Sequence, residues 1–193
     1  MTNHLAPWRT VLLGSLHRNR SQPSSRYIQL ATVTLDGKPA NRTVVFRGFL
    51  DNSNQLQIIT DSRSSKLSEI SQHPWGEICW YFPKTREQFR LTGQLTIITE
   101  NSPNQEPRIA LWQKLSDAAR QQFTWPNCQE SFIENNPNFF QASPCQNEPL
   151  SNFCLLLFDP HKVDHLELQK KPHHRYIYYL DETESWISKR INP

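Results

Sequence analysis

The sequence contains no long hydrophobic run. None of its apolar stretches approaches the roughly 18 residues that a membrane-spanning helix needs, and residues 1–20 lack the apolar segment of a secretory signal. We therefore expect a soluble, cytoplasmic protein with no membrane partner. Without a secretory signal, the glycosylation pattern over residues 41–43 carries little meaning.

The sequence also lacks a strong charge imbalance and a metal-binding pattern. Its formal net charge is +3 with no domain-wide basic face, so we expect no nucleic-acid partner. The four cysteines show no CxxC spacing, and we expect no metal site. Cys79 and Cys154 fall in apolar, strand-like segments and are expected in the core. A disulfide between Cys128 and Cys145 is possible in principle but disfavoured in a reducing cytosol.

The apolar fraction is low, at 36%, but aromatic residues are plentiful. Six Trp, five Tyr and ten Phe can supply much of the buried area of a core. The length suits one domain, so we expect residues 1–193 to form a single domain. Association with a second copy of the chain would bury further surface.

Hydrophobic periodicity predicts many short strands and few helices. Apolar residues at helical spacing predict an N-terminal helix over about 6–20, and further helices are expected over 64–74 and 107–123. The predicted strands cover residues 27–35, 39–49, 55–60, 76–82, 87–99, 152–160, 162–169, 175–180 and 185–191.

Two details refine this expectation. Gly93, in the middle of a long predicted strand, indicates a bulge or sharp bend. Residues 124–151 are rich in Pro, Asn, Gln and Ser and predict a long loop. The order of elements favours a mainly β fold with some α, a closed or partly closed antiparallel barrel with peripheral helices.

The predicted strand Asn41–Phe49, NRTVVFRGF, carries two arginines. Because side chains alternate along a strand, Arg42 and Arg47 point to opposite faces, each beside core-like residues. A buried charge is costly unless it is paired. Each of the two arginines therefore needs a partner for its charge on its own face of the strand.

The segment Thr60–Lys66, TDSRSSK, has the donors of a phosphate site. A strand ends there, and serines and two cations precede a predicted helix. Unpaired backbone N–H groups at a helix start attract anions, and hydroxyl and ammonium groups add donors. The alternative is that the serines cap a surface helix and the cations are solvated.

Four motifs in order carry a resemblance to a known family. They are RTVVFR, the Ser-rich TDSRSSK, REQFRLTG, and the C-terminal RYIYYLDETESWISKRINP. Together they resemble the pyridoxamine 5'-phosphate oxidase family of FMN-binding split barrels. The N-terminal PWR helix looks like that of a stand-alone subgroup whose substrate is uncertain. The resemblance runs from about Tyr27 to Pro193, with residues 124–151 unmatched.

The resemblance implies a split antiparallel β-barrel, a homodimer with FMN at its interface, and a set of cofactor contacts. In chain order, the implied contacts are Arg42, Thr43, Val44, Val45, Phe46, Arg47, Ile59, Thr60, Ser65, Lys66, Gln88, Ser116, Asp117 and Arg175. Lys66 matches the phosphate-binding lysine of the family, and Ser65 stands where the oxidases have a second cation. Ser116 and Asp117 would reach the FMN bound mainly to the other subunit.

The resemblance also implies roles in catalysis and substrate binding. Arg47 and Arg175 are the candidate catalytic residues, because a cation near the flavin ring stabilises the anionic reduced flavin. Lys171 and His173 are candidate substrate contacts. His173 and His174 could also be read as metal ligands, but no suitably spaced carboxylate or cysteine accompanies them.

Two function classes follow. The first is an FMN-dependent oxidoreductase resembling pyridoxamine 5'-phosphate oxidase, whose flavin takes a hydride from a small, possibly phosphorylated, amine and passes electrons to O₂. The alternative is a non-catalytic flavin-binding or sensor protein, or an FMN reductase-like protein. The sequence does not specify the substrate or the electron acceptor.

Overall fold

The computed structural model describes residues 5–193. Over these residues the strands are β1 (Tyr27–Val33), β2 (Pro39–Phe49), β3 (Leu56–Asp61), β4 (Trp75–Phe82), β5 (Glu87–Ile98), β6 (Phe153–Glu167), β7 (His174–Leu180) and β8 (Trp186–Ile191). The α-helices are α1 (Pro7–Arg18), α2 (Lys66–Gln72), α3 (Glu106–Gln113) and α4 (Asp117–Gln121). Short 3₁₀ turns cover Pro23–Arg26, Gln122–Thr124 and Pro137–Phe140.

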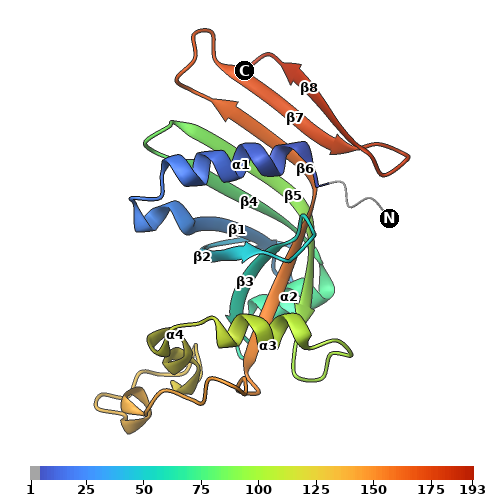
Figure 1. Cartoon of the computed structure of the whole chain (residues 1–193). Helices are drawn as coiled ribbons and strands as arrows, with labels where there is room; N and C mark the ends of the chain where they lie inside the picture. Colours follow the sequence, from blue (N-terminus) through green and yellow to red (C-terminus); the bar gives the residue numbers. More distant parts are fainter. Residues whose placement is uncertain (1–4) are drawn as a thin grey trace.

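The strands form one antiparallel sheet that closes on itself. The order is β3-β2-β1-β4-β5-β6-β7-β8, and an additional pairing between β3 and β6 closes the first six into a barrel. The β7–β8 hairpin continues from the far end of β6 and projects beyond the barrel (Figure 1). The predicted mainly β barrel with peripheral helices is confirmed.

Strand β6 makes closure possible because its two halves have different partners. Its first half pairs with β3 and its second half with β7, while β5 pairs with both halves. The prediction of two strands, 152–160 and 162–169, was wrong, because Pro160 lies at an irregularity of one continuous strand rather than at its end. The pairing shifts between Thr92 and Gly93, so the predicted bulge is confirmed.

Glycine is required at this bulge by close packing of two backbones. A Cβ on Gly93 would lie 2.1 Å from the carbonyl oxygen of Asp159, far inside van der Waals contact. Only a residue without a side chain allows β5 and β6 to stay paired across the bend.

The helix predicted over 107–123 is two helices. α3 ends at Gln113, and α4 starts at Asp117 after Ser116, whose side chain accepts a hydrogen bond from the Ala119 N–H. Apolar spacing alone did not reveal this break, but serine is a favoured N-cap. Residues 125–151 carry only the short 3₁₀ turn at Pro137–Phe140.

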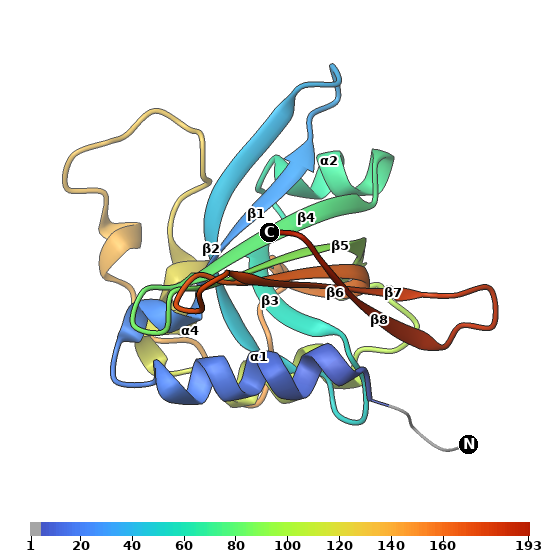
Figure 2. The ribbon, with the colours of Figure 1, turned by 90° about the horizontal axis from the view of Figure 1, so that it is seen from above.

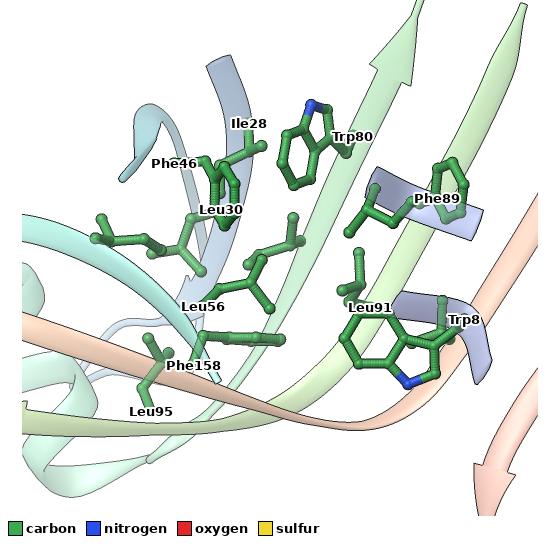
Figure 3. Packing of buried hydrophobic residues seen from close by; sticks show 14 of the residues in the cluster. Trp8, Ile28, Leu30, Phe46, Leu56, Trp80, Phe89, Leu91, Leu95 and Phe158 are labelled. Carbon is green, nitrogen blue, oxygen red and sulfur yellow. The ribbon is translucent and has the colours of Figure 1, made fainter. Parts of the chain in front are cut away.

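Aromatic side chains fill the barrel, as their abundance suggests. Trp80, Phe46, Phe89 and Phe158 are almost completely buried and lie among aliphatic residues from most of the barrel strands (Figure 3). Burying each phenylalanine contributes about 1.5–3 kcal/mol. The aromatic rings thus supply the core that the low apolar fraction left in question.

Helix α1 lies along one side of the barrel (Figures 1 and 2) and contacts both the barrel and the projecting hairpin. Its fully buried Trp8 packs against Phe49 of β2 and Trp186 of β8, with ring centroids 6.1 and 5.8 Å apart. This indole joins three elements that are distant in sequence.

The other end of α1 is held by Glu87, a buried carboxylate on β5. Arg18 forms an ion pair of 2.7 Å with it, Ser15 donates a hydrogen bond to it, and the His165 ring lies 3.5 Å away. Burial opposes ionisation, but His165, Ser15 and Arg18 outweigh it and lower the pKa of Glu87 to about 2.

The cysteines are free thiols. Cys154 is buried as expected, but Cys79 is only half-buried, because it points to the outer face of β4, opposite Arg90. Cys128 and Cys145 are exposed and unbonded. Within residues 5–193, no helix is long and apolar enough to cross a bilayer, and no group of three or more His, Cys, Asp or Glu side chains is placed to hold a metal.

Candidate functional site

A cavity of about 390 Å³ opens where β2 and β3 separate. The two strands pair only from Phe46 to Phe49 on β2 and from Leu56 to Ile58 on β3. Beyond these pairs the strands diverge, and the cavity occupies the gap. It is lined by Arg42, Thr43, Val44, Val45, Arg47, Ile59, Thr60, Asp61, Arg63, Lys66, Gln122, Phe123, Trp125, Pro126 and Cys128.

The gap leaves one edge of β2 without a strand partner. In the described chain, residues 42–45 pair with β1 on one side but not with β3 on the other. Backbone N–H and C=O groups that point into such a gap need another partner. The cavity thus presents main-chain donors and acceptors, and Val44, Val45 and Ile59 are among the residues that line it.

The two arginines of β2 have the opposite orientations that strand alternation predicts. Arg42 lies on the face that carries the core residue Phe46, and its guanidinium forms an ion pair of 2.8 Å with Glu69 of α2. It also donates a hydrogen bond to Thr32. The inward cation therefore has its partner within the chain, although Arg42 still lines the cavity.

Arg47 has a different environment. It sits where the β2–β3 pairing is irregular, just before Gly48, whose φ of +131° favours glycine. Its Nε atom is buried and has no hydrogen-bond partner among residues 5–193. Burial, and then repulsion from Arg26, lower the pKa of Arg47. A negatively charged ligand would relieve both effects.

Lys66 provides a second cation without an ion-pair partner in the described structure. Its Nζ atom donates to the Thr60 hydroxyl at 2.9 Å and to the Ser64 hydroxyl. Burial, and then repulsion from Arg42, lower the pKa of Lys66. The ammonium group lines the cavity and bonds only to hydroxyl groups, so it can bind an anionic ligand.

Arg63 is a cation of the cavity that the sequence motif contained but did not assign. It is paired with Asp61 through contacts of 2.6 and 2.8 Å, and it also bonds to Trp125 and Asn127. The lining residues from 122 to 128 were not predicted either, because they lie in or beside a loop without periodicity. No sequence signal placed them here.

The structure brings together half of the predicted site. Eight predicted residues line the cavity: Arg42, Thr43, Val44, Val45, Arg47, Ile59, Thr60 and Lys66. Phe46 does not line it, and its side chain points into the core; the resemblance implies a contact only through its backbone, which stays a prediction. Ser65 does not line it either; it is the N-cap of α2, and its side chain makes no capping bond.

Gln88 and Arg175 lie on a different part of the sheet. They face outward on β5 and β7, on either side of Leu166. β1 and β4 separate β5 from β2, a path of roughly 14 Å along the sheet. Arg175 is paired with Asp164 at 2.8 Å. Neither predicted contact reaches the cavity of its own chain.

The remaining predicted residues also lie outside the cavity. Ser116 caps α4, and Asp117 forms an ion pair with Arg120. Lys171 and His173 lie in the exposed loop between β6 and β7, and His173 lines a separate hollow with the C-terminal residues 189–193. Contact of Ser116 and Asp117 with the cofactor, and of Lys171 and His173 with a substrate, stays a prediction.

The cavity fits the chemistry of FMN. This cofactor joins an anionic phosphate to a flat, largely apolar ring with hydrogen-bonding edges. Lys66 and Arg47 offer two unpaired cations, the β2 edge offers main-chain groups, and Val45 and Trp125 offer apolar surface. Burial lowers the pKa of both Arg47 and Lys66, so keeping them charged costs free energy. An anionic ligand would offset that cost.

Comparison with known proteins agrees with this assignment. Residues 5–99 match the family model described as pyridoxamine 5'-phosphate oxidase, FMN-binding domain. The chain is 37% identical to pyridoxine/pyridoxamine 5'-phosphate oxidase 2 of Arabidopsis thaliana over 213 residues, covering 100% of both proteins.

Solved structures give the same result. The crystal structure of a pyridoxamine 5'-phosphate oxidase-related, FMN binding protein from Nostoc punctiforme is 53% identical, with a TM-score of 0.95, and the match covers 98% of this chain and 100% of that one. PhzG from Burkholderia lata shares the fold, with a TM-score of 0.79 at 18% identity over 98% of this chain and 94% of that one.

Proposed function

The chain belongs to the FMN-binding pyridoxamine 5'-phosphate oxidase family, with FMN as its cofactor, and we propose that it is an FMN-dependent oxidoreductase acting on a small amine. When bound, FMN would supply the two-electron chemistry of hydride acceptance and of electron transfer to O₂. The observation that carries the proposal is the cavity in the β2–β3 gap, which is lined by two cations without ion-pair partners and by an unpaired strand edge.

Each part of the cavity has a role in this proposal. Lys66, steadied by the hydroxyl of Thr60, would hold the phosphate of FMN. The free edge of residues 42–45 would bond to the polar parts of the cofactor. Arg47 would place a positive charge beside the ring, which favours acceptance of a hydride.

We further propose that two copies of the chain complete the site. Gln88 and Arg175 lie on the outer face of the sheet, and a second copy related by two-fold symmetry could bring them to the cavity. Large apolar side chains are exposed on that same outer face, as expected of an interface. They are Tyr27, Trp75, Tyr81 and Tyr179.

One observation favours a second candidate function, a flavin carrier or sensor without turnover. In the oxidases that this chain resembles, a Tyr/Arg/Ser trio holds the substrate phosphate. The corresponding region here is about residues 99–107, TENSPNQEP, with only Arg108 as a nearby cation. Arg108 is buried, and it donates to the carbonyl oxygens of Phe153 and Leu150 at 2.8 and 2.7 Å. It is not available to a substrate.

Anaerobic reduction separates these functions. The flavin-loaded protein is mixed with pyridoxamine 5'-phosphate without oxygen, and the flavin absorbance is followed before and after air is admitted. The oxidoreductase predicts bleaching and recovery in air. Persistent colour with pyridoxamine 5'-phosphate contradicts oxidation of that amine, and bleaching by a reduced nicotinamide instead favours a reductase-like function.

A further inference from the structure

The long segment after α4, residues 125–151, is held near both of its ends by hydrogen bonds around one residue of the cofactor cavity, Asp61. Asn152 follows the segment, and its side-chain amide donates to Asp61 Oδ2 at 2.8 Å and to the carbonyl oxygen of Phe123 at 2.9 Å. The carbonyl oxygen of Asn152 accepts a hydrogen bond from the Ser62 N–H. Both ends of the segment are thus fastened to the end of β3.

Arg63 fastens the first residues of the segment in the same place. Its Nε and Nη2 atoms donate to the two carboxylate oxygens of Asp61 at 2.8 and 2.6 Å. Its Nη1 atom donates to the carbonyl oxygen of Trp125 and to Asn127 Oδ1, both at 2.9 Å. A guanidinium held in such a fork has little freedom, so it can fix the backbone to which it bonds.

The bonded segment forms part of the wall of the cavity that contains Lys66. Trp125, Pro126 and Cys128 line the cavity together with Lys66. Trp125 also contacts the ring of Phe139, at 6.0 Å between ring centroids. Hydrogen bonds and charge hold Asp61 ionised, because the contacts from Arg63 outweigh the opposing effect of burial and lower the pKa of Asp61.

We propose that Arg63, fixed by Asp61, is a positioning residue that clamps residues 125–128 over the phosphate end of the FMN site. The clamp slows the release of FMN, and it selects FMN over FAD, because FAD carries its adenylyl group on that phosphate and would have to displace the clamped residues. This inference rests on the FMN site proposed above and assigns a task to the segment that the family resemblance leaves unmatched.

The test compares flavin release and flavin choice in three full-length variants. Arg63→Met removes the clamp, and Asn127→Ala removes one of its bonds at an exposed position where folding is not at risk. Arg18→Met is the matched control, since it breaks an ion pair of similar length to Glu87, away from the cavity. Release of FMN after dilution is followed by flavin fluorescence, and FMN and FAD affinities are measured by titration of the flavin-free protein.

The clamp predicts that Arg63→Met speeds FMN release about tenfold or more, the effect of losing a charge-assisted hydrogen bond. Asn127→Ala speeds it severalfold, and Arg18→Met leaves it unchanged. The preference for FMN over FAD falls in the same order. Wild-type release and preference in both clamp variants overturn the clamp while leaving the FMN site intact. If the wild-type protein binds no FMN, the proposed function and the clamp are both overturned.

Discussion

Replacing Lys66 with methionine tests the phosphate end of the site. Methionine keeps most of the side-chain volume but removes the charge. In the described structure the Lys66 ammonium bonds only to hydroxyl groups, those of Thr60 and Ser64. Its removal therefore leaves no carboxylate without a partner. The free energy of unfolding of the unliganded variant should lie within about 1 kcal/mol of the wild-type value. The substitution should instead weaken the binding of FMN.

The size of that loss follows from the burial of the ammonium group. Two unit charges 4 Å apart attract by about 4 kcal/mol at the effective dielectric of a protein surface, and desolvation and side-chain ordering offset part of this. A net cost of about 1–3 kcal/mol is expected. The Kd for FMN should then rise roughly 5- to 160-fold.

Titration with two flavins isolates the phosphate. Riboflavin has the same ring but no phosphate, so Lys66→Met should leave its affinity unchanged. Lys38→Met, on an exposed hairpin, is the matched control and should change neither affinity. Isothermal titration calorimetry or flavin fluorescence measures both ligands.

The pH dependence gives a second signature. Burial lowers the pKa of Lys66 from its ordinary 10.5 in the unliganded protein, and a bound phosphate raises it again. FMN binding therefore takes up a proton between these two pKa values, and the affinity should fall as the pH rises through that window. Lys66→Met should abolish this fall. Equal losses for FMN and riboflavin, or no loss, would refute the phosphate role.

Three further predictions concern the fold that supports the site. Glu87→Gln should lower the free energy of unfolding by about 3 kcal/mol at neutral pH, since the pKa of Glu87 is lowered from 4.5 to about 2 in the folded protein. As the pH falls from 4.5 to about 2, the wild-type protein should lose this stability, and the variant should lose less. Denaturant unfolding at a series of pH values measures both. Gly93→Ala should destabilise by roughly 3 kcal/mol or separate β5 from β6, and an unchanged melting temperature would contradict the clash with Asp159. Arg42→Met should cost about 3 kcal/mol because it strands the buried carboxylate of Glu69, and the double variant with Glu69→Gln should recover part of the loss.

Much of the barrel could be predicted from the sequence because its strands alternate and its turns are short. The second strand was predicted with its observed bounds, 39–49, and the bulge at Gly93 was expected from a glycine in mid-strand. The continuity of β6 could not be predicted. Pro160 locally resembles a strand end, and only the pairing with β5 on both sides of it keeps the strand whole.

The candidate site also contains residues that the sequence predicted and residues that it did not. Residues of β2 and β3 could be placed together because a short hairpin joins them, and the structure puts eight predicted residues around one cavity. The clamp by Arg63 could not be foreseen, since its partners Trp125 and Asn127 lie in a segment without periodicity. Gln88 and Arg175 could be matched to the family motifs, but sequence order did not reveal that they lie outside the cavity of their own chain.

The visible absorption spectrum of the purified protein tests the central claim most directly. If the gap between β2 and β3 is an FMN site, the protein is yellow, or becomes so when FMN is added, and saturates at one FMN per chain. The bound flavin should be displaced from Lys66→Met more readily than from wild type. A colourless protein that binds no added FMN would contradict the account.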